Sequence, residues 1–520
     1  MIFTGPHPPV PVPDTSFTAF VLERAEQHAD LVATVDVTGT TAYTFRELAS
    51  AIERAAEGLR ARGFGSGQVL AILAPNLPEY PIAFHAAAHA GGTVVVLNPL
   101  DTVDDLTAHL NEAGARLLVI SPAELDTAQK LLAGTLVEEI IVLGPTGAQL
   151  PGTTPFAALL TQGVAPGTAV DPAADVVALL HSSGSTGHPK GVMLTHRNMI
   201  ANVLQTSTVA PLDADEKVLA VPPFHHAFGL IMVMNASLLQ GATLVTMPRF
   251  DPEGYLRAIQ EHRITRLYVV PTIAVLLAKS PLVDRYDLSS VREIVSGGAA
   301  LDPETARLCR ERLGCRVGQG YGLTEALVSF MQLDHSVAPG SVGRNSPNIE
   351  CKIVDTGTGR ALGRHQNGEI LIRGPHVMKG YLNAEEATRQ VLEPDGFLHT
   401  GDLGYVDRNG ELFIVDRIKE LIKYKGQQVS PVELEAVLMT HPKVADAAVV
   451  GVPDEEASEI PKGFVVTREP ATAEEIMAFV AERVAPYKKI RQVEFIEQIP
   501  RTPVGKIQRR ALKEWGCTTR

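Results

Sequence analysis

The chain has 520 residues, of which 45% are hydrophobic and 20% charged, and its formal net charge at pH 7 is −13. This length exceeds what one hydrophobic core supports, so we expect two or more domains. The negative balance argues against a general nucleic-acid-binding protein, which needs a basic face. Four cysteines without a CxxC pair favour reduced thiols and a cytoplasmic location, and neither a secretory signal nor a membrane-spanning segment is expected.

Up to about residue 340, short apolar runs alternate with amphipathic stretches. Strands are expected at 68–73, 94–97, 116–120, 176–180, 217–221, 243–247, 266–270 and 293–295. Helices are expected at 79–90, 104–114, 198–205, 252–262 and 302–313. This alternation predicts parallel sheets whose two faces are covered by helices.

The pattern changes after about residue 340. Three expected strands, at 349–355, 369–373 and 411–415, are linked by turns rich in Gly, Asp and Asn, which predicts a more antiparallel, barrel-like segment. A charged stretch follows, and beyond it helices are expected at 431–439 and 472–484 within a small α/β unit. We therefore predict an α/β protein with a large domain over residues 1–416, made of two α/β subdomains and the β-rich segment, and a small α/β domain over 417–520.

One loop has the composition of a phosphate-binding loop. Residues 182–191 read Ser-Ser-Gly-Ser-Thr-Gly-His-Pro-Lys-Gly, between an expected strand and an expected helix. Glycines let backbone N–H groups approach phosphate oxygens, hydroxyls add donors, and the lysine adds a positive charge. The order differs from a Walker A loop, because Pro precedes the lysine and Gly follows it. The residues expected to hold a triphosphate are Ser182, Ser183, Gly184, Ser185, Thr186, Gly187 and Lys190.

Further segments extend this pattern over nearly the whole chain. They read Val-Pro-Pro-Phe-His-His-Ala-Phe-Gly-Leu at 221–230, Gly-Gln-Gly-Tyr-Gly-Leu-Thr-Glu at 318–325, His-Thr-Gly-Asp at 399–402, Asp-Arg-Ile-Lys-Glu at 416–420 and Pro-Arg-Thr-Pro-Val-Gly-Lys-Ile at 500–507. With the phosphate loop, these segments resemble the acyl-adenylate-forming superfamily of acyl-CoA synthetases, adenylation domains and firefly luciferase. The segments 368–375 and 419–426 are most similar to 4-coumarate-CoA and cinnamate-CoA ligases.

The resemblance implies the residues of the nucleotide site. Lys506 would touch both the carboxylate and the α-phosphate, with Lys190, Glu325 and Thr186 as the other catalytic residues. Glu325 and Thr186 would bind Mg²⁺, since hard oxygen donors suit that ion. The implied contacts to ATP or AMP include Gly298, Gln319, Gly320, Tyr321, Thr324, Asp402 and Arg417, with Gln428 as a further contact to the adenylate. Alternative readings are a turn aspartate for Asp402, a surface ion pair with Asp416 or Glu420 for Arg417, and a solvated lysine for Lys506.

The resemblance also implies an acyl pocket. Its residues would be His225, His226, Phe228, Gly297, Gly320, Ala326 and Leu327. Counting back from Phe228 aligns His226 with the family histidine, which leaves simple packing as the alternative role for His225. Phe228 stands where 4-coumarate ligases often carry a tyrosine, and it cannot hydrogen-bond to a para-hydroxyl group. This difference weakens the case for specificity toward 4-hydroxycinnamate.

A mobile C-terminal domain is implied as well. It would rotate about Lys419, so that one orientation brings Lys506 to the adenylate and the other admits coenzyme A. The residues expected to meet coenzyme A are Arg249, Lys423, Lys425 and Gly426. Such a local cluster of cations explains how an acidic chain binds polyanions.

The activity implied is ATP-dependent adenylation of a carboxylic acid, aryl or cinnamate-like in preference to a fatty acid, followed by thioester formation with coenzyme A. ATP, Mg²⁺ and coenzyme A are the expected cofactors and cosubstrates, with no nucleic-acid partner, and a homodimer is left open. Three alternatives stay open: activation of nitrite to diazotise an aromatic amine, loading of a carrier protein, and a nucleotide-binding pseudoenzyme. The presence of Glu325, Asp402 and Lys506 argues against the last.

Overall fold

The computed structural model describes residues 1–518 except 145–150, 162, 164–165, 183–189, 334–337, 426, 455 and 503–505. The chain divides into two compact units. The large unit comprises Thr4–Glu350 and Ile372–Leu398, and the small unit Met1–Phe3, Cys351–Leu371 and His399–Arg520. The boundary expected at residue 416 stays a prediction. Among the described residues, no helix is long and apolar enough to cross a membrane.

The large unit contains an eight-stranded sheet. Its order is β20 (Gly380–Tyr381), β10 (Lys190–Thr195), β9 (Val176–Ser182), β5 (Thr93–Leu97), β4 (Val69–Leu73), β6 (Leu117–Ile120), β7 (Glu139–Val142) and β8 (Thr154–Pro155). The strands from β9 to β8 are parallel, whereas β10 is antiparallel to both β9 and β20. The antiparallel strands β9 and β10 flank the predicted phosphate loop, and we call this pair the phosphate-loop hairpin.

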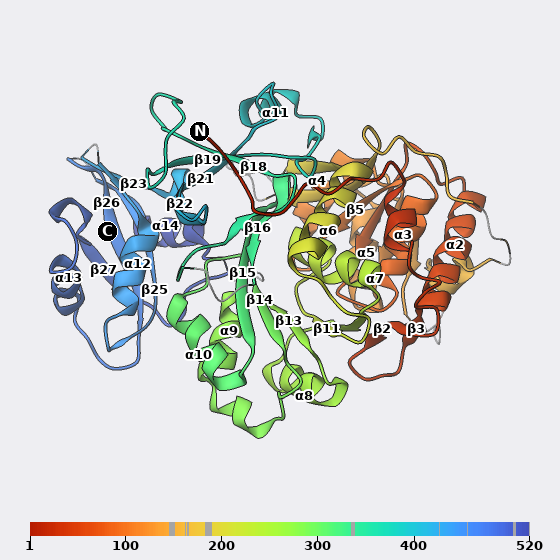
Figure 1. The fold of residues 1–520 in the computed structure, drawn as a ribbon, viewed down its shortest axis with the longest axis horizontal. Coiled ribbons are helices and arrows are strands. Elements are labelled where there is room, and N and C mark those ends of the chain that lie inside the picture. The colour runs from red at the N-terminus through yellow and green to blue at the C-terminus, as the bar shows by residue number, and fades with distance from the viewer. Residues whose placement is uncertain are drawn as a thin grey trace. The chain divides into compact units, whose positions relative to one another are not determined.

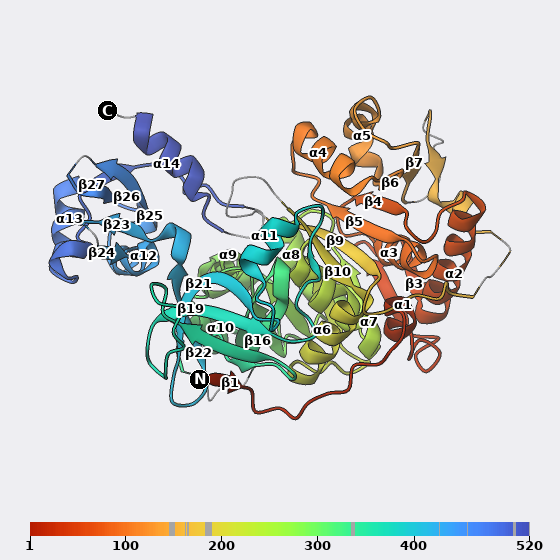
Figure 2. The same cartoon turned by 90° about the horizontal axis from the view of Figure 1, so that it is seen from above.

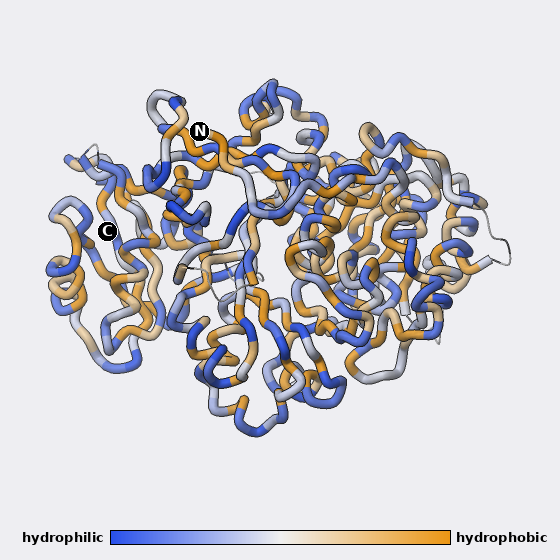
Figure 3. The backbone as a smooth tube through the Cα atoms, in the orientation of Figure 1, coloured by the Kyte–Doolittle hydropathy of each residue, from blue (hydrophilic) through white to orange (hydrophobic). Residues whose placement is uncertain are grey.

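Helices cover both faces of this sheet (Figure 2). Leu70 and Ile72 of β4 pack in one core with α2 (Phe45–Ala61) and α3 (Tyr80–His89). The alternate residues Ala71 and Leu73 pack in a second core with α4 (Val103–Ala113) and α5 (Leu125–Leu132). Successive strand residues point to opposite faces, so a strand buried on both sides is apolar throughout. Figure 3 colours the backbone by hydropathy and shows orange, hydrophobic segments within the large unit among blue, hydrophilic ones.

A nine-stranded sheet forms the rest of the large unit (Figure 1). Its order is β17 (Arg344–Asn345), β16 (Leu327–Gln332), β15 (Arg316–Leu323), β14 (Glu293–Ser296), β13 (Arg266–Val269), β11 (Lys217–Ala220), β12 (Thr243–Thr246), β2 (Val32–Asp36) and β3 (Ala42–Thr44). The six strands from β15 to β2 are parallel. The other helices of this unit are α1 (Phe17–Val21), α6 (His196–Val209), the π-helix η3 (Gly229–Asn235), α7 (Ala236–Gln240), α8 (Pro252–His262), α9 (Pro271–Lys279), α10 (Pro303–Leu313) and α11 (Glu385–Val391).

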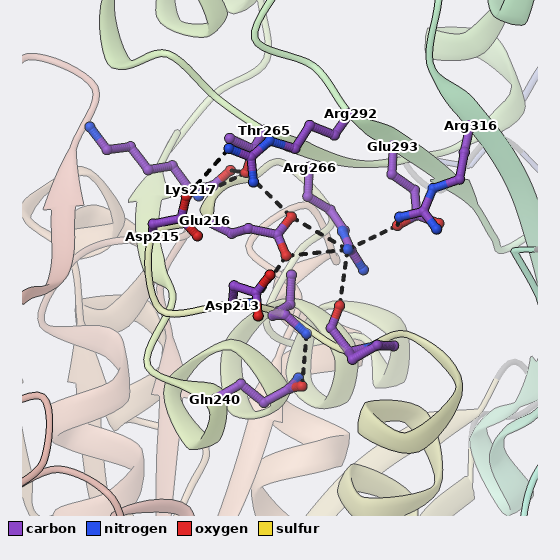
Figure 4. A network of polar contacts seen from close by, with 12 residues as sticks. Asp213, Asp215, Glu216, Lys217, Gln240, Thr265, Arg266, Arg292, Glu293 and Arg316 are labelled. Carbon is purple, nitrogen blue, oxygen red and sulfur yellow. Dashed lines mark hydrogen bonds and ion pairs between the residues drawn. The ribbon is translucent and has the colours of Figure 1, made fainter.

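The amino ends of these parallel strands meet in a buried charge network (Figure 4). Arg266 Nη2 lies 2.9 Å from Glu293 Oε2 and 3.4 Å from Glu216 Oε2, and the three side chains are at most 5% exposed. Arg316 Nη2 reaches Glu293 Oε2 at 3.1 Å. The carboxyl ends of the same strands lie at the opposite edge, where parallel sheets place binding residues.

The small unit contains two five-stranded sheets. The first has the order β1 (Ile2–Thr4), β18 (Glu350–Val354), β19 (Gly368–Arg373), β21 (Leu398–Val406) and β22 (Leu412–Arg417). The second has the order β24 (Gln427–Val429), β23 (Ile422–Tyr424), β26 (Ser458–Thr467) and β25 (Val444–Asp454), with β27 (Gln492–Phe495) beside β26. Its helices are α12 (Pro431–Met439), α13 (Ala473–Ala481) and α14 (Arg509–Thr518).

The predicted α/β fold class is confirmed. Most expected elements lie within two residues of the observed ones, and the β-rich part expected from about residue 340 is the first five-stranded sheet. The strand that follows the phosphate loop was not predicted. β10 begins at Lys190 and lies between the phosphate loop and α6, and α6 follows Thr195, whose side chain accepts a capping hydrogen bond from the Asn198 N–H.

Candidate active site

The phosphate loop closes a β-hairpin. Ser182 at the end of β9 faces Lys190 at the start of β10. Ser182 Oγ is buried and has no hydrogen-bond partner among the described residues. The expected loop residues Ser183, Gly184, Ser185, Thr186 and Gly187 lie outside the described residues. The hairpin therefore fixes both ends of the loop, and its phosphate-binding role stays a prediction.

Lys190 and Glu325 both contact the side chain of Tyr381. Lys190 Nζ stands 5.0 Å from the centroid of the Tyr381 ring, within range of a cation–π contact. The Tyr381 hydroxyl donates a 2.9 Å hydrogen bond to Glu325 Oε1. Burial, and then the Glu325 carboxylate, raise the pKa of Tyr381, so the hydroxyl stays protonated as a donor. Sequence reasoning did not single out Tyr381, which lies beyond the segment 368–375 used for the family resemblance.

The Glu325 carboxylate fits a magnesium ligand. It belongs to the short 3-10 helix η5 (Thr324–Ala326) and is partly exposed. Tyr381 occupies Oε1, and no other described residue donates a hydrogen bond to this carboxylate. Mg²⁺ prefers one or two carboxylates together with phosphate oxygens and water, so a half-satisfied carboxylate near a phosphate loop suits it.

Three other expected nucleotide residues of the large unit, Gln319, Gly320 and Tyr321, lie within β15. Gln319 uses its side chain internally, accepting from the Leu301 N–H at 3.2 Å and donating to the Ser341 carbonyl at 2.7 Å. The Tyr321 ring lies beside the Phe330 ring, 6.0 Å between centroids. The remaining expected contacts in this unit are Gly298, which has φ +84°, Gly320 and Thr324. Their roles toward ATP remain predictions.

The expected acyl pocket brings Phe228 against Gly297. A Cβ at Gly297 would lie 3.1 Å from the Phe228 ring, so glycine is what allows this close approach. Phe228 also packs edge-to-face on Tyr268, 5.9 Å between ring centroids. Tyr268 is an aromatic inside an expected strand, and nothing in its spacing distinguished it from the core. Burial raises its pKa to about 12, while the positive charge of Arg266 opposes that shift.

The two adjacent histidines differ in environment. Both are partly exposed, and His226 Nδ1 accepts from the Phe228 N–H at 3.3 Å. Burial lowers the pKa of His225 to about 4, so this imidazole is neutral at physiological pH. The last expected pocket residues, Ala326 and Leu327, are buried. Leu327 has φ +46°, a backbone conformation that is strained for a residue with a side chain.

In the small unit, the expected ribose residue Asp402 faces Arg417. The two are register partners of β21 and β22, and Asp402 Oδ1 lies 3.1 Å from Arg417 Nε. The structure thus brings the Arg417 side chain to Asp402, and the roles of both residues toward ATP remain predictions. Glu369 accepts a hydrogen bond at 3.1 Å from the N–H of Gly401, the residue before Asp402 in β21.

The hinge and coenzyme A residues of this unit are mostly exposed. Lys419 lies in the 3-10 helix η6 (Ile418–Glu420), and Lys423, Lys425 and Gln428 line strands β23 and β24 and their turn. Lys425 has φ +48°, and Gly426 lies outside the described residues. Arg249 belongs to the large unit, where it is exposed just after β12.

The expected catalytic lysine sits at the base of a loop. An antiparallel bridge joins Arg501 to Ile507, and the Lys506 N–H donates to Thr502 Oγ1 at 3.1 Å. Thr502 N–H in turn donates to the Lys506 carbonyl at 2.8 Å. The backbone of Lys506 is thereby fixed within the small unit.

Two family models and many known proteins match this chain. Residues 21–382 match the model of the AMP-binding enzyme family, and residues 433–506 match that of the AMP-binding enzyme C-terminal domain. A 4-coumarate–CoA ligase-like protein from Oryza sativa subsp. japonica is 40% identical, covering 99% of this chain and 95% of its own.

Two solved structures are similar along almost the whole chain. ATP-bound MatB from Rhodopseudomonas palustris is 28% identical with a TM-score of 0.88, covering 96% of this chain and 99% of its own. An anthranilate CoA ligase in complex with anthranoyl-AMP is 26% identical with a TM-score of 0.87, covering 97% and 98%. The chain belongs to the AMP-binding enzyme family.

Proposed function

We propose that this chain is an AMP-forming acid–CoA ligase acting on an aryl or cinnamate-like acid. The observation that carries the proposal is the meeting of Lys190 and Glu325 on Tyr381, beside the base of the phosphate-loop hairpin. A cation and a half-satisfied carboxylate at that place suit a nucleotide with its metal.

In the first half-reaction, a carboxylate oxygen of the acid forms a bond to the α-phosphorus of ATP, and the bond to the β-phosphate oxygen breaks. Pyrophosphate leaves and acyl-AMP remains. Lys190 and Lys506 would offset the negative charge that repels the incoming carboxylate. Asp402 would accept hydrogen bonds from the ribose hydroxyls. Bound Mg²⁺, held by Glu325 and Thr186, would neutralise phosphate charge.

In the second half-reaction, the thiol of coenzyme A forms a bond to the acyl carbon, AMP leaves with the oxygen it held, and the thiol proton passes to solvent. Rotation about Lys419 would withdraw Lys506 and bring in the exposed residues Lys423 and Lys425. Arg249 and Gly426 complete the proposed coenzyme A contacts. This sequence of orientations separates two steps that need different groups at one carbonyl.

The proposed substrate class rests on the relatives and on the pocket. The relatives are named as ligases of 4-coumarate and anthranilate, both aromatic acids. In this chain the Phe228 ring packs against Gly297 on one side and edge-to-face on Tyr268. Phe228 offers no donor to a para-hydroxyl group, so we propose that unsubstituted or apolar-substituted rings are preferred to 4-coumarate.

The test is acid-dependent ATP–pyrophosphate exchange over a panel of benzoates, cinnamates and fatty acids, with thioester formation measured by mass. Exchange with an aromatic acid and a coenzyme A thioester are expected. Exchange without a thioester would indicate another acceptor, such as a carrier protein. A diazo product from nitrite and an aminobenzoate, with no acid-dependent exchange, would overturn the proposal in favour of the diazotase.

We also propose a cytoplasmic location and leave a homodimer as the assembly to test by light scattering. The described cysteines Cys309, Cys315 and Cys351 are buried and unpaired, which fits a reducing compartment.

A further inference from the structure

The segment of residues 374–382, which contains β20, extends the phosphate-loop hairpin. Tyr381 is the register partner of Val192 in β10. The Lys379 N–H donates to the Met193 carbonyl at 2.9 Å, and the Leu382 N–H donates to the Gly191 carbonyl at 2.7 Å. One side of this segment is therefore a third strand on the hairpin that Lys190 begins.

The same segment also holds the turn that carries Glu325. The Met378 N–H donates to the Glu325 carbonyl at 2.9 Å, and the Tyr381 hydroxyl reaches Glu325 Oε1 at the same distance. Behind the turn, buried His376 Nε2 lies 3.0 Å from Ser329 Oγ, which donates to the Ala326 carbonyl. The turn is thus tied to the segment through both backbone and side chains.

The side chain of Tyr381 contacts both the hairpin that begins at Lys190 and the turn that contains Glu325. Its ring lies under the Lys190 ammonium, its hydroxyl binds the Glu325 carboxylate, and the residue is 8% exposed. A glutamate and a lysine each have several rotatable bonds, and an ordered neighbour removes part of that freedom before the ligand arrives. Partners of this kind around a metal ligand orient it and support its affinity for the metal.

We propose that Tyr381 is a positioning residue that orients Glu325 toward the magnesium of the bound nucleotide and Lys190 toward its phosphates. This inference rests on the proposed function for the identity of the nucleotide and metal. The hydroxyl acts on the carboxylate and the ring acts on the ammonium, so the two effects separate by substitution.

Tyr381→Phe removes the hydroxyl and keeps the ring over Lys190. The Mg²⁺ concentration for half-maximal pyrophosphate exchange should rise about 10-fold, in the range seen when a partner of a metal ligand is removed. The KM for ATP at saturating Mg²⁺ and the kcat should stay near the wild-type values. Tyr381→Leu removes both contacts, so it should also raise the KM for ATP at saturating Mg²⁺.

A second readout does not depend on turnover. Binding of Mn²⁺ to the full chain with ATP, followed by electron paramagnetic resonance, should weaken about 10-fold in Tyr381→Phe. Tyr255→Phe is the matched control, because the Tyr255 hydroxyl is buried without a partner among the described residues. It should leave both readouts unchanged, and circular dichroism checks that each variant is folded.

Unchanged Mn²⁺ binding and unchanged Mg²⁺ dependence in folded Tyr381→Phe would overturn the inference. An equal loss in Tyr255→Phe would also overturn it, because the effect would then be a general loss of packing. If the wild type binds Mn²⁺ with ATP and no acid supports exchange, the proposed function fails while the role of Tyr381 is still measured by metal binding.

Discussion

Asp402 and Arg417 face each other across antiparallel strands, with Asp402 Oδ1 and Arg417 Nε 3.1 Å apart. The Asp402 side chain is 3% exposed and the Arg417 side chain is 35% exposed, so the carboxylate is buried behind its partner. A buried carboxylate needs such a partner to remain ionised, and an ionised carboxylate is the better acceptor for a ribose diol.

Asp402→Asn should therefore weaken ATP binding more than it lowers the stability of the fold. A hydrogen bond to a charged group contributes about 1.5–3 kcal/mol, so the KM for ATP should rise roughly 10- to 100-fold. Steady-state kinetics with varied ATP measures the effect. Arg417→Met is the comparison, since it removes this cationic partner from the buried carboxylate, and it should lower the melting temperature as well. An unchanged KM for ATP in Asp402→Asn would contradict the ribose assignment.

Gly297→Ala should disturb the acyl pocket and leave the nucleotide site alone. The new methyl group would meet the Phe228 ring at 3.1 Å, which forces the ring to shift. We expect kcat/KM for the preferred aromatic acid to fall about 10-fold, or about 1.4 kcal/mol, with the KM for ATP unchanged. Adding Phe228→Ala should restore part of the loss, because the clash disappears. Strictly additive losses in the double variant would show that the two residues do not share a pocket.

Lys506→Ala should separate the two half-reactions. Loss of a cation that stabilises the attack on phosphorus costs about 10²- to 10³-fold in adenylation, by analogy with other electrostatic stabilisers. Thioester formation from a supplied acyl-adenylate should be much less affected. Lys513→Ala removes another lysine of the small unit and should change neither rate. Equal losses in both half-reactions of Lys506→Ala would argue against two orientations of the C-terminal domain.

Arg266→Met should cost stability in the nine-stranded sheet. It removes the buried cation that Glu216 and Glu293 share, although Arg316 remains beside Glu293. Breaking a buried ion pair from one side typically costs about 3–5 kcal/mol. Urea denaturation measures the loss. Arg263→Met breaks an ion pair with Asp287 whose members are 56% and 53% exposed, and it should cost less than about 1 kcal/mol. Similar costs for both variants would mean that the buried network contributes no more than a surface pair.

The buried histidines make stability depend on pH. Burial lowers the pKa of His85 from 6.5 to about 4, so between these values the unfolded chain binds a proton that the folded chain does not. The contribution of His85 to the free energy of unfolding is constant above pH 6.5 and falls as the pH drops toward 4. His85→Gln should flatten the slope of unfolding free energy between pH 4.5 and 6 by about 1.4 kcal/mol per pH unit. An unchanged slope would mean that His85 is protonated in the fold.

Sequence patterns predicted most helices and strands well, because residues close together in the chain specify these elements. The apolar run at 94–97 and the Asp-Pro start of the helix at 252–262 specify β5 and α8 through burial and capping that neighbouring residues supply. Residues 190–195 were missed as a strand. Their pairing with β20 depends on residues far away in the chain. Their pairing with the neighbouring strand β9 is local, but Gly191 and the preceding loop obscure the apolar pattern.

The sequence by itself determined the family, the kinds of residue present and the order of the motifs, because spacing within a segment is a property of the chain. It also supplied candidates such as Lys190, Glu325 and Asp402. Tertiary structure decided which groups meet: it placed Tyr381 between Lys190 and Glu325, set Phe228 against Gly297, and paired Arg417 with Asp402. Those contacts join segments separated by up to about two hundred residues, and only the packing of strands brings their side chains within bonding distance.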